Sequence, residues 1–212
     1  MRVYHFLSAV NALDDLTRRQ IRLSEIDRLN DPFELWCSAQ DDQLIRVALR
    51  LWKDHMAQRF GILCFSKGWS NPVLWSHYAD GHRGICLGFD VPAEGLLRPI
   101  RYVSERTPLP MPPTPEAMDE LLFTKHTDWS YEEEWRGWFQ LDQRDASGHY
   151  FYSFDEKIQL REVTVGPLCA TPKATIDAAA ASCVGSINFV KARLAFKTFQ
   201  IVENQQGFAE SQ

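Results

Sequence analysis

Short apolar runs separated by polar turns set the pattern of the chain. Residues 3–7, 62–66 and 84–89 have the length and apolar content of buried strands. The pattern predicts further strands at residues 21–23, 100–103, 150–154, 160–165 and 194–202. Helices are predicted from an N-cap at residues 8–11 to residue 20, and over residues 42–59, 116–125 and 174–184.

This order of elements favours an α+β fold. The strands are short, the helices are scattered between them, and the sequence has no repeated β-α rhythm or glycine-rich phosphate loop. We expect one α+β domain over residues 1–203, with split, mainly antiparallel sheets and helices. A polar C-terminal tail is expected at residues 204–212.

A dense polar and aromatic group lies directly before the apolar run at residues 84–89. It falls within WSHYADGHRGICLGFD, residues 75–90, and holds Trp75, His77, Tyr78, Asp80 and His82. A Ser-Asn-Pro turn at residues 70–72 predicts the start of a short helix that carries this group. Polar groups are costly to bury unless each finds a hydrogen-bond partner, so the stretch is a candidate binding site.

A second candidate is TDWSYEEEWRGWFQL, residues 127–141, whose aromatic content favours a strand. Strand alternation places Glu132, Glu134 and Arg136 on one face. Tyr131, Glu133 and Trp135 then lie on the other face. The stretch therefore predicts two carboxylates side by side on one face of a strand.

Composition and charge narrow the function classes. The net charge of −5 and the pI near 5.7 argue against bulk attraction to nucleic acid or to an anionic membrane. The N-terminal residues lack a signal-peptide core, and no apolar run approaches the ~20 residues of a membrane span. We therefore expect a cytoplasmic protein without membrane partners. Five widely spaced cysteines favour reduced thiols over a disulfide framework or a metal site.

The chemistry-bearing residues suit one reaction class. The sequence has no Gly-x-Ser-x-Gly elbow, His-Glu-x-x-His motif, Walker loop or dinucleotide fingerprint. What remains is a first-strand histidine, the polar aromatic group and a Glu-x-Glu. Cleavage of an N-glycosidic bond needs a carboxylate near the oxocarbenium-like ribose, an aromatic ring for the departing nicotinamide and a hydrogen bond to the ribose. A second carboxylate on the same strand face is placed to position or deprotonate an acceptor.

Several motifs together resemble an uncharacterised bacterial domain family over nearly the whole chain. They are YHF at 4–6, IRLS at 21–24, NDPFE at 30–34, CFS at 64–66, WSHYADGHRGICLGFD at 75–90 and YEEEWR at 131–136. Their order is also similar to the ADP-ribosyltransferase superfamily, whose members carry a first-strand His, a central Ser or Tyr motif and a catalytic Glu. The resemblance implies an ADP-ribosyltransferase-like fold, and a bacterial toxin or phage-defence effector as the setting.

The superfamily resemblance also implies NAD as substrate, with transfer of ADP-ribose to a protein or nucleic acid acceptor, or hydrolysis of NAD. It implies that His5 contacts the NAD ribose, with Ser8 nearby. It places Ser66, Ser70 and Tyr78 in the central motif, with Tyr78 stacking on nicotinamide. Glu134 would be the catalytic glutamate and Glu132 the acceptor-side carboxylate. The central motif departs from Ser-Thr-Ser, and three successive glutamates leave the catalytic register open between these two.

Other interpretations of the same residues stay open. His5 on an apolar strand is compatible with a plain core histidine. His77 and His82 are metal-ligand types, but their spacing matches no known metal motif, so no metal is predicted. Glu134 and Arg136 are spaced for structural ion pairing on one strand face. The alternative to an enzyme is a non-catalytic nucleotide- or protein-binding module of the same fold.

Overall fold

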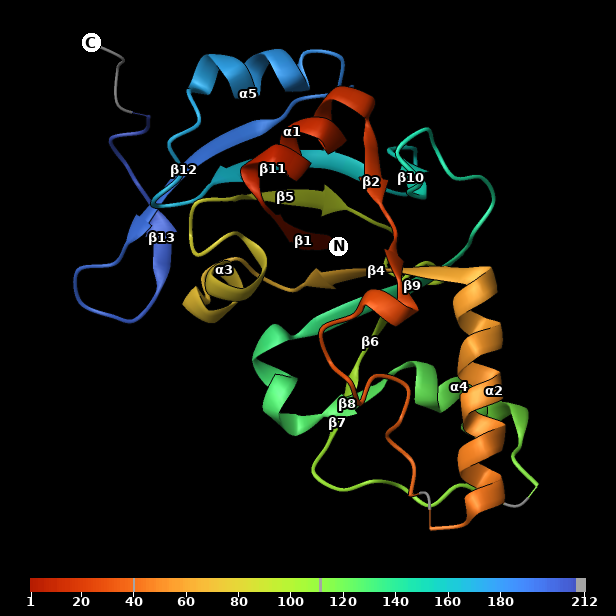
Figure 1. Cartoon of the computed structure of the whole chain (residues 1–212). Coiled ribbons are helices and arrows are strands. Elements are labelled where there is room, and N and C mark those ends of the chain that lie inside the picture. Colours follow the sequence, from red (N-terminus) through yellow and green to blue (C-terminus); the bar gives the residue numbers. More distant parts are fainter. Residues whose placement is uncertain (40, 111, 209–212) are drawn as a thin grey trace. The chain divides into compact units, whose positions relative to one another are not determined.

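The computed structural model of the chain describes residues 1–39, 41–110 and 112–208 (Figure 1). The chain forms two compact units, each assembled from separate segments. Unit 1 comprises Met1–Arg22, Phe65–Leu96 and Phe151–Gln212, and unit 2 comprises Leu23–Cys64 and Leu97–Tyr150. Among the described residues, nine strands form a mixed, mostly antiparallel sheet, in the order β13-β12-β11-β5-β1-β4-β9-β6 with β3 on β4. The α+β class expected from the sequence is confirmed.

Unit 1 is centred on β5 (Ile85–Asp90), five of whose six residues are buried. β1 (Arg2–Leu7) pairs antiparallel with the whole length of β5. On its other edge β5 pairs antiparallel with β11 (Gln159–Val165), and β11 runs parallel to β12 (Asn188–Leu194). The neighbours of this core are β13 (Ile201–Glu203) on β12, and a two-stranded sheet of β2 (Gln20–Arg22) and β10 (Phe151–Ser153).

The described part of unit 1 contains three helices, and two of them begin at stretches where the sequence predicts a helix start. α1 (Ala9–Arg18) begins after Ser8, whose hydroxyl accepts a hydrogen bond from the Asn11 amide at 3.3 Å. α3 (Pro72–Tyr78) begins after Asn71, whose side-chain oxygen accepts from the Val73 amide at 2.9 Å. α5 (Lys173–Ala180) packs against α1 on one face of the unit 1 strands (Figure 1).

The stretch between α3 and β5 is anchored by Trp75, which is fully buried. The Trp75 indole donates to the Trp69 carbonyl at 2.6 Å, and its ring meets that of Phe6 edge-on with centroids 5.2 Å apart. Gly84 lies so close to β1 that a Cβ atom there would overlap the Leu7 carbonyl oxygen. Trp75 and Gly84 are therefore packing residues within WSHYADGHRGICLGFD.

Among its described residues, unit 2 contains two α-helices, of which α2 is the longer, and mostly short strands. Its elements are β3 (Ser24–Glu25), the 3₁₀ helix η1 (Ile26–Arg28), α2 (Gln43–Arg59), β6 (Arg98–Pro99), β7 (Arg101–Val103), α4 (Pro115–Leu122), β8 (Thr124–His126), the 3₁₀ helix η2 (Thr127–Glu132) and β9 (Glu134–Gln140). β7 and β8 pair in parallel, and β6 pairs antiparallel with β9. β4 (Phe60–Ser66) begins in unit 2 and ends in unit 1.

Four sequence expectations differ from the structure. Residues 194–202 were expected to form one strand, but they contain the β12–β13 turn, where Phe196 and Phe199 are 89% and 99% exposed. The stretch at 127–141 begins as the 3₁₀ helix η2 and becomes a strand only at Glu134. The helix at 116–125 ends at Leu122, and β8 follows. α2 is present, and the helical spacing of Leu44, Ala48, Leu51, Trp52 and Met56 predicted its apolar face. Its buried residue is instead Leu49, while Leu44 and Leu51 are exposed.

The remaining expectations from the sequence concern the C-terminal tail, membrane-spanning helices and the cysteine thiols. Asn204 to Gly207 form a hydrogen-bonded turn, and the rest of the expected tail lies outside the described residues from 209 onward. Among the described residues, no helix has both the length and the apolar content needed to cross a bilayer. All five cysteines are free thiols.

Candidate functional site

Five charged side chains meet in the interior of unit 2, and we call them the buried ion cluster. They are three carboxylates and two cations: Glu34, Glu132, Glu134, Lys125 and Arg136. Each of the five residues is at most 4% exposed. Charged groups are among the least often buried in proteins, and the cost of removing them from water is several kcal/mol per ion before pairing. A cluster of this size is therefore the leading candidate for a functional site in unit 2.

Arg136 is the hub of the buried ion cluster. Its Nε donates to Glu134 Oε1 at 2.8 Å and its Nη2 donates to Glu134 Oε2 at 3.1 Å. Its Nη1 donates to Glu34 Oε1 at 2.6 Å and to the Leu122 carbonyl at 3.1 Å. The planar guanidinium matches the two-pronged carboxylate, so the Glu134 side chain is fixed in one orientation.

Lys125 joins the two glutamates of the Glu-x-Glu. Its Nζ donates to Glu132 Oε2 at 2.6 Å and to Glu134 Oε2 at 3.4 Å. The same ammonium lies 4.5 Å from the centre of the Trp129 ring, within the range of a cation–π contact. The two carboxylates are thus held on one ammonium, although η2 carries one and β9 carries the other.

A left-handed residue brings both glutamates inward. Glu133 has φ 43°, a conformation that non-glycine residues rarely adopt, and its own side chain is exposed. This turn lets Glu132, at the end of η2, point to the same interior as Glu134, at the start of β9. Leu35, the residue after Glu34, also has positive φ, at 65°. Strained backbone thus flanks all three carboxylates, and such strain clusters at functional sites.

Glu134 keeps its carboxylate charge inside the cluster. Burial alone raises the pKa of Glu134. The positive charges of Arg136 and Lys125 lower this pKa by more than burial raises it, so it falls to about 2. Burial likewise opposes the charge of Lys125, but Glu134 and Glu132 raise the Lys125 pKa above its ordinary value. Burial raises the pKa of the neighbouring Cys64 thiol, and the Glu134 charge adds to that shift. The site therefore holds fixed charges and a protonated thiol at neutral pH.

The Glu134 backbone is fixed as well. Its amide donates to the Tyr102 hydroxyl oxygen at 2.9 Å. Burial is the main reason that the Tyr102 pKa rises to about 12, so the phenol stays neutral. Both the main chain and the side chain of Glu134 are thereby positioned before any ligand arrives.

The structure brings Glu132 and Glu134 together, but not as neighbours on one strand. Alternation along a strand predicted Glu132, Glu134 and Arg136 on one face, and all three are indeed buried. Glu132 belongs to η2, so the expectation that a strand carries both carboxylates is wrong. The left-handed Glu133 is what restores their common direction.

The other five predicted site residues belong to unit 1. His5 lies on β1, and its ring centroid is 5.7 Å from that of Phe65. Ser8 uses its hydroxyl as the N-cap of α1, and Ser66 is buried at the end of β4 opposite Tyr4. Within unit 1, His5 and Ser66 therefore lie on neighbouring strands.

Ser70 and Tyr78 flank the ends of α3. Ser70 is exposed, and its carbonyl accepts from the Ile201 amide at 2.8 Å. Tyr78 is the last residue of α3, and its ring meets that of His77 at a right angle with centroids 6.0 Å apart.

No group of three or more His, Cys, Asp or Glu suited to a metal ion occurs among the described residues.

Sequence reasoning missed three members of the site environment, Glu34, Lys125 and Tyr102. Glu34 lies in the NDPFE motif but had no assigned chemistry, and Lys125 was expected only as the end of a helix. Arg136 was considered as a structural partner of Glu134, and its ion pairs with Glu134 and Glu34 are present. Tyr102 carried no sequence signal. The non-glycine residues with positive φ in or directly after these motifs are invisible to a periodicity pattern; they are Leu35, Glu133, Asp80 and His82.

No family model, curated protein or solved structure matches the chain. The functional argument therefore depends on the buried ion cluster and on the resemblance of the motifs.

Proposed function

We propose that the chain is an NAD-consuming enzyme of the ADP-ribosyltransferase type, which transfers ADP-ribose to a macromolecule or hydrolyses NAD. The observation that carries the proposal is the pair Glu132 and Glu134, held on the Lys125 ammonium at 2.6 and 3.4 Å inside unit 2. The finer fold assignment, an ADP-ribosyltransferase-like arrangement of the sheet, is part of the same proposal.

The proposed reaction breaks the bond between the ribose C1′ and the nicotinamide nitrogen. The bonding electron pair goes to the nicotinamide ring and cancels its positive charge, which leaves an oxocarbenium-like ribose. A carboxylate that is already oriented and ionised stabilises this cation without reorganising during the reaction. Glu134 has these properties, because Arg136 fixes its orientation and its pKa lies near 2.

The second carboxylate serves the acceptor. A water or an acceptor hydroxyl attacks C1′ and loses its proton to Glu132, so the new C–O bond forms as the O–H bond breaks. Lys125 positions Glu132 through the 2.6 Å hydrogen bond. The NAD contacts that we propose are His5, Ser8, Ser66, Ser70 and Tyr78, with Tyr78 as the ring against nicotinamide.

Three glutamine variants test the catalytic assignment. The purified chain is incubated with NAD, and released nicotinamide is measured by chromatography. Loss of a preorganised electrostatic group lowers kcat about 10²- to 10³-fold, so we expect the kcat of Glu134→Gln to be lower by that factor. Glu132→Gln should lose transfer to the acceptor more than it loses cleavage. Glu133→Gln is the matched control, since Glu133 is exposed and outside the cluster, and it should keep wild-type activity.

Variants in unit 1 test the NAD contacts separately. We expect His5→Ala to raise KM for NAD with a smaller effect on kcat, because it removes binding that is shared by ground and transition states. Wild-type activity in Glu134→Gln would overturn the catalytic assignment, and an unchanged KM in His5→Ala would remove His5 from the NAD contacts.

A second candidate function is a non-catalytic nucleotide- or protein-binding module. It is favoured by the saturation of Glu134, since Arg136 occupies both of its carboxylate oxygens. In this case the cluster serves to hold unit 2 together. Calorimetric binding of NAD with no release of nicotinamide would select the nucleotide-binding module, whereas absence of both would exclude NAD as ligand.

A further inference from the structure

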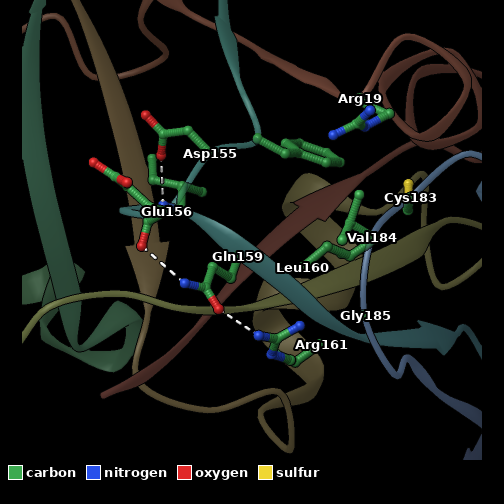
Figure 2. A pocket seen from close by; sticks show the side chains of 11 residues that line it. Arg19, Asp155, Glu156, Gln159, Leu160, Arg161, Cys183, Val184 and Gly185 are labelled. Atoms are coloured by element: carbon green, nitrogen blue, oxygen red, sulfur yellow. Dashed lines mark hydrogen bonds between the residues drawn. The ribbon is translucent and has the colours of Figure 1, made fainter.

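A separate pocket of about 390 Å³ lies within unit 1 and contains none of the residues proposed to contact NAD. Its volume falls in the range of about 300–1,000 Å³ that is typical of small-molecule sites. Its walls come from four chain segments: the residue after α1, the turn after β10, the first half of β11 and the loop after α5. Figure 2 shows Arg19 and Cys183 at one side of this pocket, and Asp155 and Glu156 at the opposite side.

Arg19 is the unusual residue of the pocket. It is the C-cap of α1 in a left-handed conformation, with φ 54°, and its amide donates to carbonyls of the last helical turn. Its half-buried side chain makes no hydrogen bond or ion pair with any residue that the structure describes, and its Nε is shielded from solvent. A shielded Nε–H without an acceptor is costly, and an anion bound in the pocket would supply the missing acceptor.

The acidic residues of the pocket do not compete for Arg19. Asp155 accepts hydrogen bonds from the Lys157 and Ile158 amides through Oδ1, and from the Tyr152 hydroxyl through Oδ2. It is therefore committed to its own turn. Glu156 is exposed, and its carbonyl accepts from the Gln159 side chain at 2.9 Å. The charged side chains of the pocket that are half-buried, Arg19 and Arg161, are both positive, whereas Asp155 and Glu156 are exposed.

A second arginine and an aromatic ring complete the site. The Arg161 guanidinium donates to the Gln159 side-chain oxygen, and the backbone of Gly185 lies against it so closely that any Cβ there would overlap. Gly185 has φ 97°, so it supplies both the conformation and the space. The Phe154 ring lines the pocket and is fixed by Phe89, with centroids 5.2 Å apart, and the Phe154 amide donates to the Arg19 carbonyl at 2.8 Å.

We propose that this pocket binds a small planar molecule that carries one phosphate or carboxylate group. The anionic group lies on Arg19, with Arg161 adding positive potential, and the planar ring packs on Phe154. The apolar side chains of Leu160 and Val184 cover the remainder of the ring.

The pocket contains its own reporter, the half-buried thiol of Cys183. Its Sγ lies 3.5 Å from the Leu16 carbonyl oxygen. A ligand between Arg19 and Phe154 shields this thiol, so its rate of alkylation by N-ethylmaleimide, followed by mass spectrometry, reports occupancy at this one position.

The probes separate the two halves of the proposed ligand. Phenyl phosphate carries ring and anion, inorganic phosphate carries only the anion, and phenol carries only the ring. By calorimetry we expect phenyl phosphate to bind at least about tenfold more tightly than either fragment, because both contacts contribute. We also expect it to slow Cys183 alkylation. Benzoate distinguishes a carboxylate ligand from a phosphate ligand, and the tighter of the two aryl anions identifies the group.

Two variants and one control test the residues. Arg19→Asn removes the guanidinium but keeps a residue that tolerates positive φ, and should weaken phenyl phosphate binding at least about tenfold. Val184→Trp fills the pocket from an exposed position and should abolish protection of Cys183. Lys197→Asn removes one charge from the exposed β12–β13 turn of the same unit and should bind like the wild type. Equal affinity for phosphate and phenyl phosphate, no binding of either aryl anion, or unaltered affinity in Arg19→Asn would overturn the proposal.

Discussion

Glu134 and Arg136 lie two positions apart on β9 and share two hydrogen bonds, of 2.8 and 3.1 Å, inside unit 2. The same guanidinium reaches Glu34, which is 102 residues away in the chain. One arginine thus neutralises two buried carboxylates from distant segments. The residues proposed for catalysis are therefore also residues on which the stability of unit 2 depends.

Removal of Arg136 should expose this dependence. In Arg136→Leu the Glu34 and Glu134 charges lose their shared cation, and breaking a buried pair costs about 3–5 kcal/mol. We expect a loss of that size in the free energy of unfolding, measured by urea denaturation with tryptophan fluorescence. Arg101→Leu is the control, because its ion pair with Glu120 is more than half exposed, and such pairs contribute at most about 1 kcal/mol. Equal losses in the two variants would contradict the role of the cluster.

Low pH should reduce the contribution of Glu134 to the free energy of unfolding. Its pKa is about 2 in the folded chain against 4.5 as the ordinary value. A lowered folded pKa contributes stability that is complete above pH 4.5 and is lost as the pH falls towards 2. The difference in unfolding free energy between the wild type and Glu134→Gln should shrink over this window, by up to about 1.4 kcal/mol per pH unit. The difference in unfolding free energy between the wild type and Glu133→Gln should not shrink in this way as the pH falls.

The contribution of Asp15 to stability should change with pH in the opposite direction. Burial in α1 is the main reason that its pKa rises from 3.8 to about 8, and its Oδ2 has no hydrogen-bond partner among the described residues. A raised folded pKa contributes stability that is complete below pH 3.8 and is lost as the pH rises through 8. The asparagine of Asp15→Asn does not titrate, so this variant should gain stability relative to the wild type between those values. A thermal unfolding series across pH measures the gain.

Asp14→Asn is the matched control for Asp15. Asp14 lies on the exposed side of α1 and pairs with Arg18 at 2.8 Å. Loss of an exposed i,i+4 pair costs about 0.3–0.5 kcal/mol. A pH-dependent gain in Asp14→Asn as large as that in Asp15→Asn would contradict the assignment.

Two glycines in the same unit should respond differently to alanine. A Cβ at Gly84 would overlap the Leu7 carbonyl oxygen and lie 2.9 Å from the Ala79 backbone, and backbone atoms cannot move aside cheaply. We expect Gly84→Ala to lower the free energy of unfolding by about 1–3 kcal/mol or more. Nothing lies within 4 Å of a Cβ at Gly68, so Gly68→Ala should change stability by less than about 0.5 kcal/mol. Denaturant titration of both variants decides the comparison.

The sequence predicted those features that depend on neighbouring residues. A helix N-cap was expected within residues 8–11, and a helix start at the 70–72 turn, from residue type and position. Ser8 and Asn71 are the residues that accept the capping amide hydrogen bonds. The strand cores around β1, β4 and β5 were found because apolar runs of that length have few other structures to adopt. The α+β class followed from the order of these elements.

Features that depend on a single dihedral or a distant partner were not predicted. The aromatic residues of 127–141 favour a strand, yet the first part is helical and turns at the left-handed Glu133. Apolar periodicity also failed at 194–202, because Phe196 and Phe199 face solvent in a turn where a strand was expected. Lys125 and Glu34 entered the cluster only through the fold, since neither lies near Arg136 in sequence.

The segmented construction of unit 1 has a consequence for the order of folding during synthesis. β5, its buried central strand, needs β1 on one edge and β11 on the other. Both segments of unit 2 precede β11 and β12 in the chain, so they emerge from the ribosome before these two strands do. Unit 2 can therefore complete its core while one edge of β5 still lacks its partner. An unpaired strand edge is a template for intermolecular pairing, so the nascent chain is most prone to aggregation in the interval that ends when β12 emerges.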